Sequence, residues 1–209
     1  MVNSKFLTAA LSLALLLNIV PSVLAATLTG AGGSIPDNSP TSPLTSSVTF
    51  TDSFAIDSVT IALNNLSHTF VGDLIATLTH VETGTSVDLF NRITNNNGVN
   101  PDSSNLGGTY TFSDSAPISF LTAVRSGGTN FVVPTGSYAP TGLLSAFIGE
   151  SSLGTYLLTI SDNAAADVGT LGSFTLTLNP AAATAVPEPA TLLGLLAGCG
   201  AFARLKKRA

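Results

Sequence analysis

The sequence contains two histidines, the only side chains that could act as the base of a hydrolytic triad. His68 lies within Ser67-His68-Thr69-Phe70, and His80 ends an alternating apolar segment. A structural role is the ordinary one at both positions. No Gly-x-Ser-x-Gly motif or other setting that would activate a serine accompanies them. The sequence therefore predicts a protein that is not an enzyme.

Acidic residues form the second set that could do chemistry, as ligands of calcium. Asp162 and Asp167 bracket an alanine-rich turn, Asp73 follows a glycine, and Asp114 stands in a third loop. Calcium takes about six to eight oxygen ligands from carboxylates, amides and carbonyls on loops. These acids predict a calcium site; the alternative is that Asp and Asn only build turns here, through hydrogen bonds to the nearby backbone.

The N-terminus has the three parts of a secretory signal peptide. Lys5 supplies the positive charge, the apolar segment runs from Phe6 to Val20, and Val23-Leu24-Ala25 is a small-residue cleavage site. The expected signal helix spans residues 1–25, and the mature chain is expected to begin at Ala26. The body of the protein is therefore expected to be exported.

The C-terminus has a short motif, an apolar run and a basic end. Residues 190–203 carry no charge, and as a helix they would be about 21 Å long, short against a hydrocarbon core of about 30 Å. The basic cluster behind the run would hold the C-terminus in the cytoplasm. Its members are Arg204, Lys206, Lys207 and Arg208.

This arrangement over residues 187–209 resembles the PEP-CTERM sorting signal of bacteria. The resemblance implies that an exosortase recognises Pro187, Glu188 and Pro189 and that the chain is cleaved nearby. The short apolar helix would then be an address and not part of the mature fold, as in a GPI signal. The alternative is a plain C-terminal anchor.

The body between these signals is acidic and free of cysteine. Five of the seven basic residues and Glu188 lie in the two signals, which leaves Arg92 and Arg125 against eleven acids. Such a charge repels nucleic acids, and divalent cations are the obvious external partner. The one cysteine, Cys199, lies in the C-terminal signal, so no disulfide is expected in the body.

The sequence of the body predicts an all-β fold. Apolar residues alternate with polar ones in several segments, as at Val59, Ile61 and Leu63, and turn-forming clusters separate the segments. The denser run 156–160 predicts a strand buried on both faces. Residues 26–47, with three prolines, are expected to form an extended lead-in whose last part feeds the first strand. Short strands at this spacing favour a sandwich or barrel.

A series of motifs resembles the P-domain, also called the P/Homo B domain, which follows the catalytic domain in subtilisin-like proprotein convertases. The first motif is Ser67-His68-Thr69-Phe70-Val71-Gly72-Asp73-Leu74. Others follow in order at 84–89, 111–114, 144–150, 154–158, 161–163, 167–171 and 174–176. The resemblance covers about residues 33–180. Tyr156 and Phe174 stand where the family commonly has tryptophan, and both are large enough to fill a core.

The P-domain resemblance implies a jelly-roll β-sandwich of about eight antiparallel strands, followed by a linker over 181–186. It also makes the matched acids the calcium candidates, since some bacterial P-domains bind calcium. The apolar periodicity predicts a core that includes Leu74, Leu78, Leu89, Phe112, Leu158, Ile160, Phe174 and Leu176.

Two functions are compatible with these signals. The first is an exported, non-catalytic protein of the cell envelope or extracellular matrix, anchored transiently by the C-terminal helix. The second is an accessory P-domain that assists a separate subtilisin-like endopeptidase; a long apolar patch on one sheet would favour it. The expected partners are an exosortase, the export machinery, and either a surface polysaccharide or a separate peptidase.

Overall fold

The computed structural model describes residues 24–182. The predicted signal peptide up to residue 23, and the predicted sorting signal from Pro187 onward, lie outside the described residues. The described part contains nine strands: β1 Ala26–Ile35, β2 Leu44–Phe50, β3 Ile56–His68, β4 Leu74–His80, β5 Ser86–Asn91, β6 Leu106–Phe112, β7 Gly136–Tyr138, β8 Gly154–Asp162 and β9 Gly169–Pro180. Its helical segments are short: α1 Phe120–Val124 and the 3-10 turns η1 Val71–Asp73 and η2 Leu144–Phe147. The prediction of an all-β protein is confirmed.

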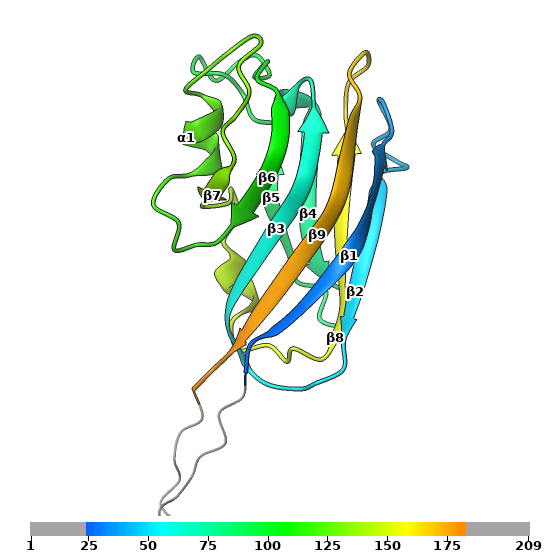
Figure 1. The fold of residues 1–209 in the computed structure, drawn as a ribbon, viewed down its shortest axis with the longest axis vertical. Coiled ribbons are helices and arrows are strands. Elements are labelled where there is room, and N and C mark those ends of the chain that lie inside the picture. Colours follow the sequence, from blue (N-terminus) through cyan, green and yellow to red (C-terminus); the bar gives the residue numbers. More distant parts are fainter. Residues whose placement is uncertain (1–23, 183–209) are drawn as a thin grey trace, which may run out of the picture. The chain divides into compact units, whose positions relative to one another are not determined.

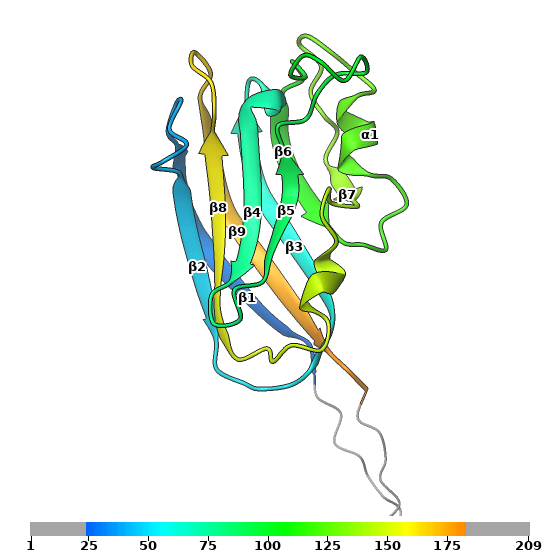
Figure 2. The ribbon, with the colours of Figure 1, turned by 180° about the vertical axis from the view of Figure 1, so that it is seen from behind.

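The strands form two sheets that face each other (Figures 1 and 2). One has five strands in the order β1-β9-β3-β6-β7, and the other has four in the order β2-β8-β4-β5. All strand pairs are antiparallel except β6 and the short β7, which run parallel. The two inner faces enclose one core.

The predicted core positions are correct. All eight of the side chains predicted to be buried are at most 1% exposed, and so is Tyr156. The prediction that residues 156–160 are buried on both faces is wrong. Burial alternates along β8, so that Leu157 and Thr159 lie half-exposed on the outer face, because no further layer covers the four-stranded sheet.

Residues 26–35 are more than the extended lead-in that the sequence predicts. They form β1, which pairs with β9 from Ala26 opposite Leu178 to Ile35 opposite Gly169. Hydroxyl pairs across the two strands reinforce this register, with Thr27 Oγ1 2.9 Å from Thr177 Oγ1. The three prolines follow in the connection to β2, where the missing N–H groups interrupt no ladder.

A cluster of aromatic rings closes the sandwich beside β7. Phe120, on α1, lies 5.1 Å from Phe90 and 5.2 Å from Phe112 between ring centroids, and all three side chains are fully buried. Ser119 caps the helix by accepting a hydrogen bond from the Thr122 N–H at 3.1 Å. The helix therefore serves mainly to carry Phe120 into the core.

The described chain begins and ends at the same end of the sandwich, which we call the base. This follows from the pairing of Ala26 with Leu178, and Figure 1 shows the start of β1 beside the end of β9. We call the opposite end the loop end; it carries the connections 36–43, 69–73, 92–105 and 163–168. Within residues 24–182, no helix is long and apolar enough to span a bilayer.

Candidate functional site

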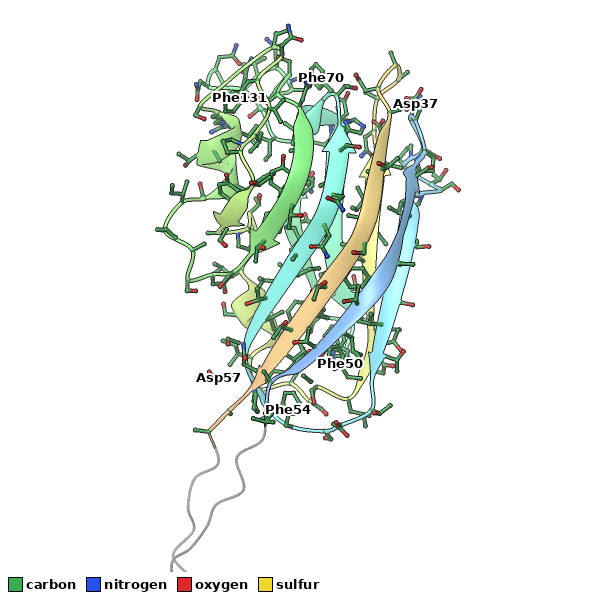
Figure 3. All side chains as sticks on the ribbon, in the orientation of Figure 1. Asp37, Phe50, Phe54, Asp57, Phe70 and Phe131 are labelled. Atoms are coloured by element: carbon green, nitrogen blue, oxygen red, sulfur yellow. The ribbon has the colours of Figure 1, made fainter. Side chains whose placement is uncertain are left out.

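The loop end brings together three of the four acids predicted to bind calcium. Asp73 ends the β3–β4 connection, Asp162 ends β8, and Asp167 follows in the β8–β9 connection. Asp37, from the β1–β2 connection, lies at the same end (Figure 3). Strands that alternate in direction return their connections to one end, which is why residues so distant in sequence meet here.

The innermost contact at the loop end joins His68 to Asp162. His68 Nε2 lies 3.2 Å from Asp162 Oδ2, and both side chains are fully buried. His68 Nδ1 lies 3.1 Å from the Phe70 nitrogen and 3.0 Å from the Phe70 carbonyl oxygen. Because a carboxylate can only accept, His68 Nε2 carries a proton and donates it to Asp162. Asp162 also accepts the Ala164 N–H through Oδ1 at 3.1 Å. Both of its oxygens are therefore used in holding the loop.

Asp73 differs, because its carboxylate accepts no hydrogen bond from any residue of the described range. Its side chain is only 7% exposed, and its one charge partner is Arg92, whose Nη2 is 3.8 Å from Oδ1. Burial raises the pKa of Asp73, and the neighbouring Asp162 and Asp167 raise it further, against a lowering by Arg92. Asp73 is thus a buried anion whose charge is incompletely compensated.

The β8–β9 connection is held by two further acids. Asp167 Oδ1 accepts the Thr69 hydroxyl at 2.5 Å, and Asp37 Oδ1 accepts the Ala166 N–H at 3.2 Å. Ala166 has a φ of 91°, a conformation that residues with a side chain rarely adopt. The bond from Asp37 therefore supports a strained turn directly beside Asp167.

Asp114, the fourth predicted ligand, lies at the base. Its two carboxylate oxygens accept the N–H groups of Leu144 and Ser145 at 2.9 and 2.7 Å. It thus satisfies the first free N–H groups of η2. The structure does not bring it together with the other three acids.

A second polar cluster, which sequence reasoning missed, lies at the base around His80. The ring is 1% exposed and stacks on Tyr156 with centroids 4.3 Å apart. Its Nδ1 is 2.9 Å from Glu150 Oε2, and Thr83 and Thr85 also donate hydroxyl hydrogen bonds to that carboxylate. Glu150 lies 70 residues from His80 in a segment without periodicity, so no local pattern could have paired them.

The charge of Glu150 follows from these contacts. Burial alone would raise the pKa of Glu150, but the hydrogen bonds from Thr85, His80 and Thr83 together outweigh it and lower the pKa. The carboxylate is therefore ionised and fixed in position. Sequence reasoning did place His80 correctly, at the end of a strand.

Neither histidine faces a serine that it could activate. In His68 both ring nitrogens contact Phe70 or Asp162, and in His80 they contact Glu150 and the Leu153 carbonyl, the latter at 3.3 Å. A triad base needs one ring nitrogen bonded to the nucleophile. The geometry of the described residues gives His68 and His80 structural contacts instead.

The four predicted calcium ligands differ in how far their carboxylate oxygens are already used by protein hydrogen bonds. Among residues 24–182, no three His, Cys, Asp or Glu side chains converge as a metal site. Asp114 and Asp162 already use both oxygens for protein hydrogen bonds. Asp73, buried and without a hydrogen-bond donor in this part of the chain, is the carboxylate best suited to a cation, with Asp167 as its neighbour.

Comparisons with known proteins give a distant likeness only. A scan against protein-family models and a search of the curated proteins give no match. Among solved structures, the chain is similar to the serine protease of Aeromonas sobria, in complex with its chaperone (TM-score 0.45, 19% identity) and alone (0.44, 18%). The alignments cover 79% and 78% of this chain and 28% of the protease chain. At these values the likeness says nothing about activity.

Proposed function

We propose that the protein is an exported, non-catalytic surface module, a P-domain-type jelly roll presented outside the cell and sorted by its C-terminal PEP-CTERM signal. The observation that carries the proposal is the arrangement of the two ends. The chain enters and leaves at the base, with Ala26 opposite Leu178, while the acidic loops lie at the other end. A tether attached beyond residue 182 would therefore present the loop end away from the membrane.

The outer face of the five-stranded sheet supports a module that faces a hydrated, neutral environment. Across the five-stranded sheet, Asp57 is the only acidic residue and no strand carries Lys or Arg. Hydroxyl and amide side chains cover its outer face in cross-strand pairs, such as Thr29 with Thr175 at 3.2 Å. A surface of this kind suits a polysaccharide matrix, because both partners offer hydroxyl groups.

The alternative function, docking on a separate subtilisin-like enzyme, has less support. Convertase-type docking would require a long apolar patch on a sheet. In the described part of the chain, the exposed large apolar side chains all lie outside the strands; Val81, Ile148 and Val168 are examples. The sheets therefore offer no such patch.

Calcium belongs to the proposal at Asp73 and not at Asp162, whose two carboxylate oxygens already contact His68 and the Ala164 N–H. A cation there would compensate a carboxylate whose pKa burial and neighbouring acids raise. Its role would be to hold the β3–β4 and β8–β9 connections together at the presented end. No reaction step depends on it.

Surface labelling tests the proposal. Antibodies raised against residues 24–182 should label intact cells that express the full chain. The purified protein should also leave casein intact. Labelling only after the cells are broken would overturn the export part, and casein cleavage abolished by replacing a single serine would overturn the non-catalytic part.

A further inference from the structure

A hollow in the described part of the chain lies at the base, beside His80. It has a volume of about 710 Å³, within the range of ligand pockets, which is about 300–1,000 Å³. Its walls come from the end of β2, the β4–β5 turn and the residues before β8. Figure 3 marks Phe50, one of its lining residues, at this end of the molecule.

The pocket has an apolar wall and an anionic rim. The half-exposed Leu153 lines it together with the methyl-bearing Thr49 and Thr51, and Phe50, only 3% exposed, lies at its wall. On the rim, the Glu82 side chain is 50% exposed. Its Oε2 accepts the Thr155 N–H at 2.7 Å, whereas its Oε1 accepts nothing from the described residues. One carboxylate oxygen is therefore free to bind a ligand.

The negative charge at the pocket has little compensation. Glu82 and Glu150 lie on either side of His80, with Glu82 Oε2 3.6 Å from His80 Nε2. The two arginines of the described range contact Asp73 and Thr94, in other parts of the molecule. His80, which carries charge only when protonated, is thus the one basic group that lines this pocket in residues 24–182.

The backbone of β8 fixes the pocket geometry. Gly154 has a φ of 141°, and a Cβ placed there would lie 2.5 Å from His80 Nε2 and 2.6 Å from Glu82 Oε2. Only glycine allows the strand to come this close to both side chains. The spacing between β8 and the side chains of His80 and Glu82 is therefore set by this glycine.

We propose that this pocket binds the side chain of a basic residue, lysine or arginine, carried by a peptide segment of a partner protein. The aliphatic stem would lie against Leu153 and the methyl groups of Thr49 and Thr51, and the charged head would reach Glu82 Oε1. Charge complementarity commits the pocket to a cation, because Glu82 is the carboxylate that lines it and no Lys or Arg does. This inference does not rest on the export or sorting of the chain.

Two matched small probes test the proposal on the full chain, purified in a mild detergent. Nα-acetyl-lysine amide carries the stem and the charge, and Nα-acetyl-norleucine amide carries nearly the same stem without the charge. Calorimetric titration should show the lysine probe binding at least about threefold tighter, the scale of an exposed ion pair. The preference should shrink in high salt.

The variant Glu82→Gln keeps an oxygen that can accept the Thr155 N–H and removes the charge. It should abolish the preference for the lysine probe, while Asp57→Asn, a charge removal on the other sheet, should leave it intact. Equal affinity for the two probes, failure of both to bind, or a preference that survives Glu82→Gln would each overturn the proposal.

Discussion

His68 and Asp162, 94 residues apart in the sequence, meet at 3.2 Å with both side chains fully buried. The pair joins the end of β3 to the end of β8 and so links the two sheets at the loop end. Its geometry explains why a histidine that could have suggested catalysis is structural here. It also explains why Asp162, an expected calcium ligand, is already engaged.

Removing the Asp162 carboxylate should therefore unfold the loop end. We expect Asp162→Ala to lower the free energy of unfolding by about 3 kcal/mol, because His68 would keep a buried N–H without an acceptor. Urea denaturation followed by circular dichroism measures this. Asp52→Ala, at an exposed loop position, is the control and should change stability by less than about 0.5 kcal/mol. A loss of similar size in both variants would contradict the structural role.

Glu150 should make the protein sensitive to acid. Its pKa is lowered in the folded state, so its contribution is present above its unfolded pKa, near 4.5, and is lost as the pH falls through the folded pKa. Glu150→Gln should cost about 1–2 kcal/mol at pH 7, because it weakens the contacts with His80 and Thr85.

The pH dependence separates this effect from simple misfolding. Urea titrations of Glu150→Gln and of the natural protein should converge as the pH falls through the lowered folded-state pKa of Glu150, because both side chains are then neutral. A difference that stays constant down to the most acidic pH at which both proteins fold would show that the ionised carboxylate is not the source of the stabilisation.

Asp73 should affect the pH dependence of stability in the opposite direction. Its pKa is raised above the ordinary value of 3.8, so the stability linked to this group is present at low pH and is lost as the pH rises through the folded pKa. Asp73→Asn should therefore stabilise the calcium-free protein at neutral pH. The same variant should lose the rise in melting temperature that we expect millimolar calcium to give the natural protein.

Asp114→Asn is the matched control, since Asp114 lies at the base and binds backbone N–H groups. It should lower the melting temperature and keep the calcium response. If neither calcium nor a chelator changes the melting temperature of the natural protein, the proposed calcium site at Asp73 is wrong.

Phe120 should be the most important side chain of α1. Its ring contacts Phe90, Phe112 and two tyrosines of the core. Phe120→Ala should cost about 3–5 kcal/mol, as truncations of buried aromatic residues do. Leu121→Ala, at a half-buried neighbour, should cost about 1 kcal/mol or less. Equal losses in urea denaturation would show that α1 does not fill the core in this way.

The parts of the fold that follow from local periodicity could be predicted from the sequence. Alternation at Val59, Ile61 and Leu63 places one face of β3 inside, and the eight predicted core residues are buried for the same reason. The strand at residues 26–35 is harder to predict, because three glycines and the small alanines weaken the alternation of apolar and polar residues. Their strand character depends on pairing with β9, a tertiary contact.

The site could be predicted only in its composition. The sequence identifies Asp73, Asp162 and Asp167 as candidates, but which carboxylate is already used is decided by His68 and by backbone N–H groups that no spacing reveals. Residue type and the matched motifs also group Asp114 with them, whereas the structure places it at the base. The contact of His80 with Glu150 depends on the positions of the β4–β5 turn and the residues before β8, which only the folded chain determines.

The intact mass of the surface form tests the central proposal most directly. The full chain should be expressed in a host that has the exosortase and in the same host without it, and the surface protein should be weighed by mass spectrometry. With the enzyme, the mass should correspond to a chain that begins at Ala26 and ends near the Pro187-Glu188-Pro189 motif, and Glu188→Ala should prevent the C-terminal loss. A surface protein that still contains Cys199 and the basic residues from Arg204 to Arg208 would contradict sorting and indicate a plain C-terminal anchor.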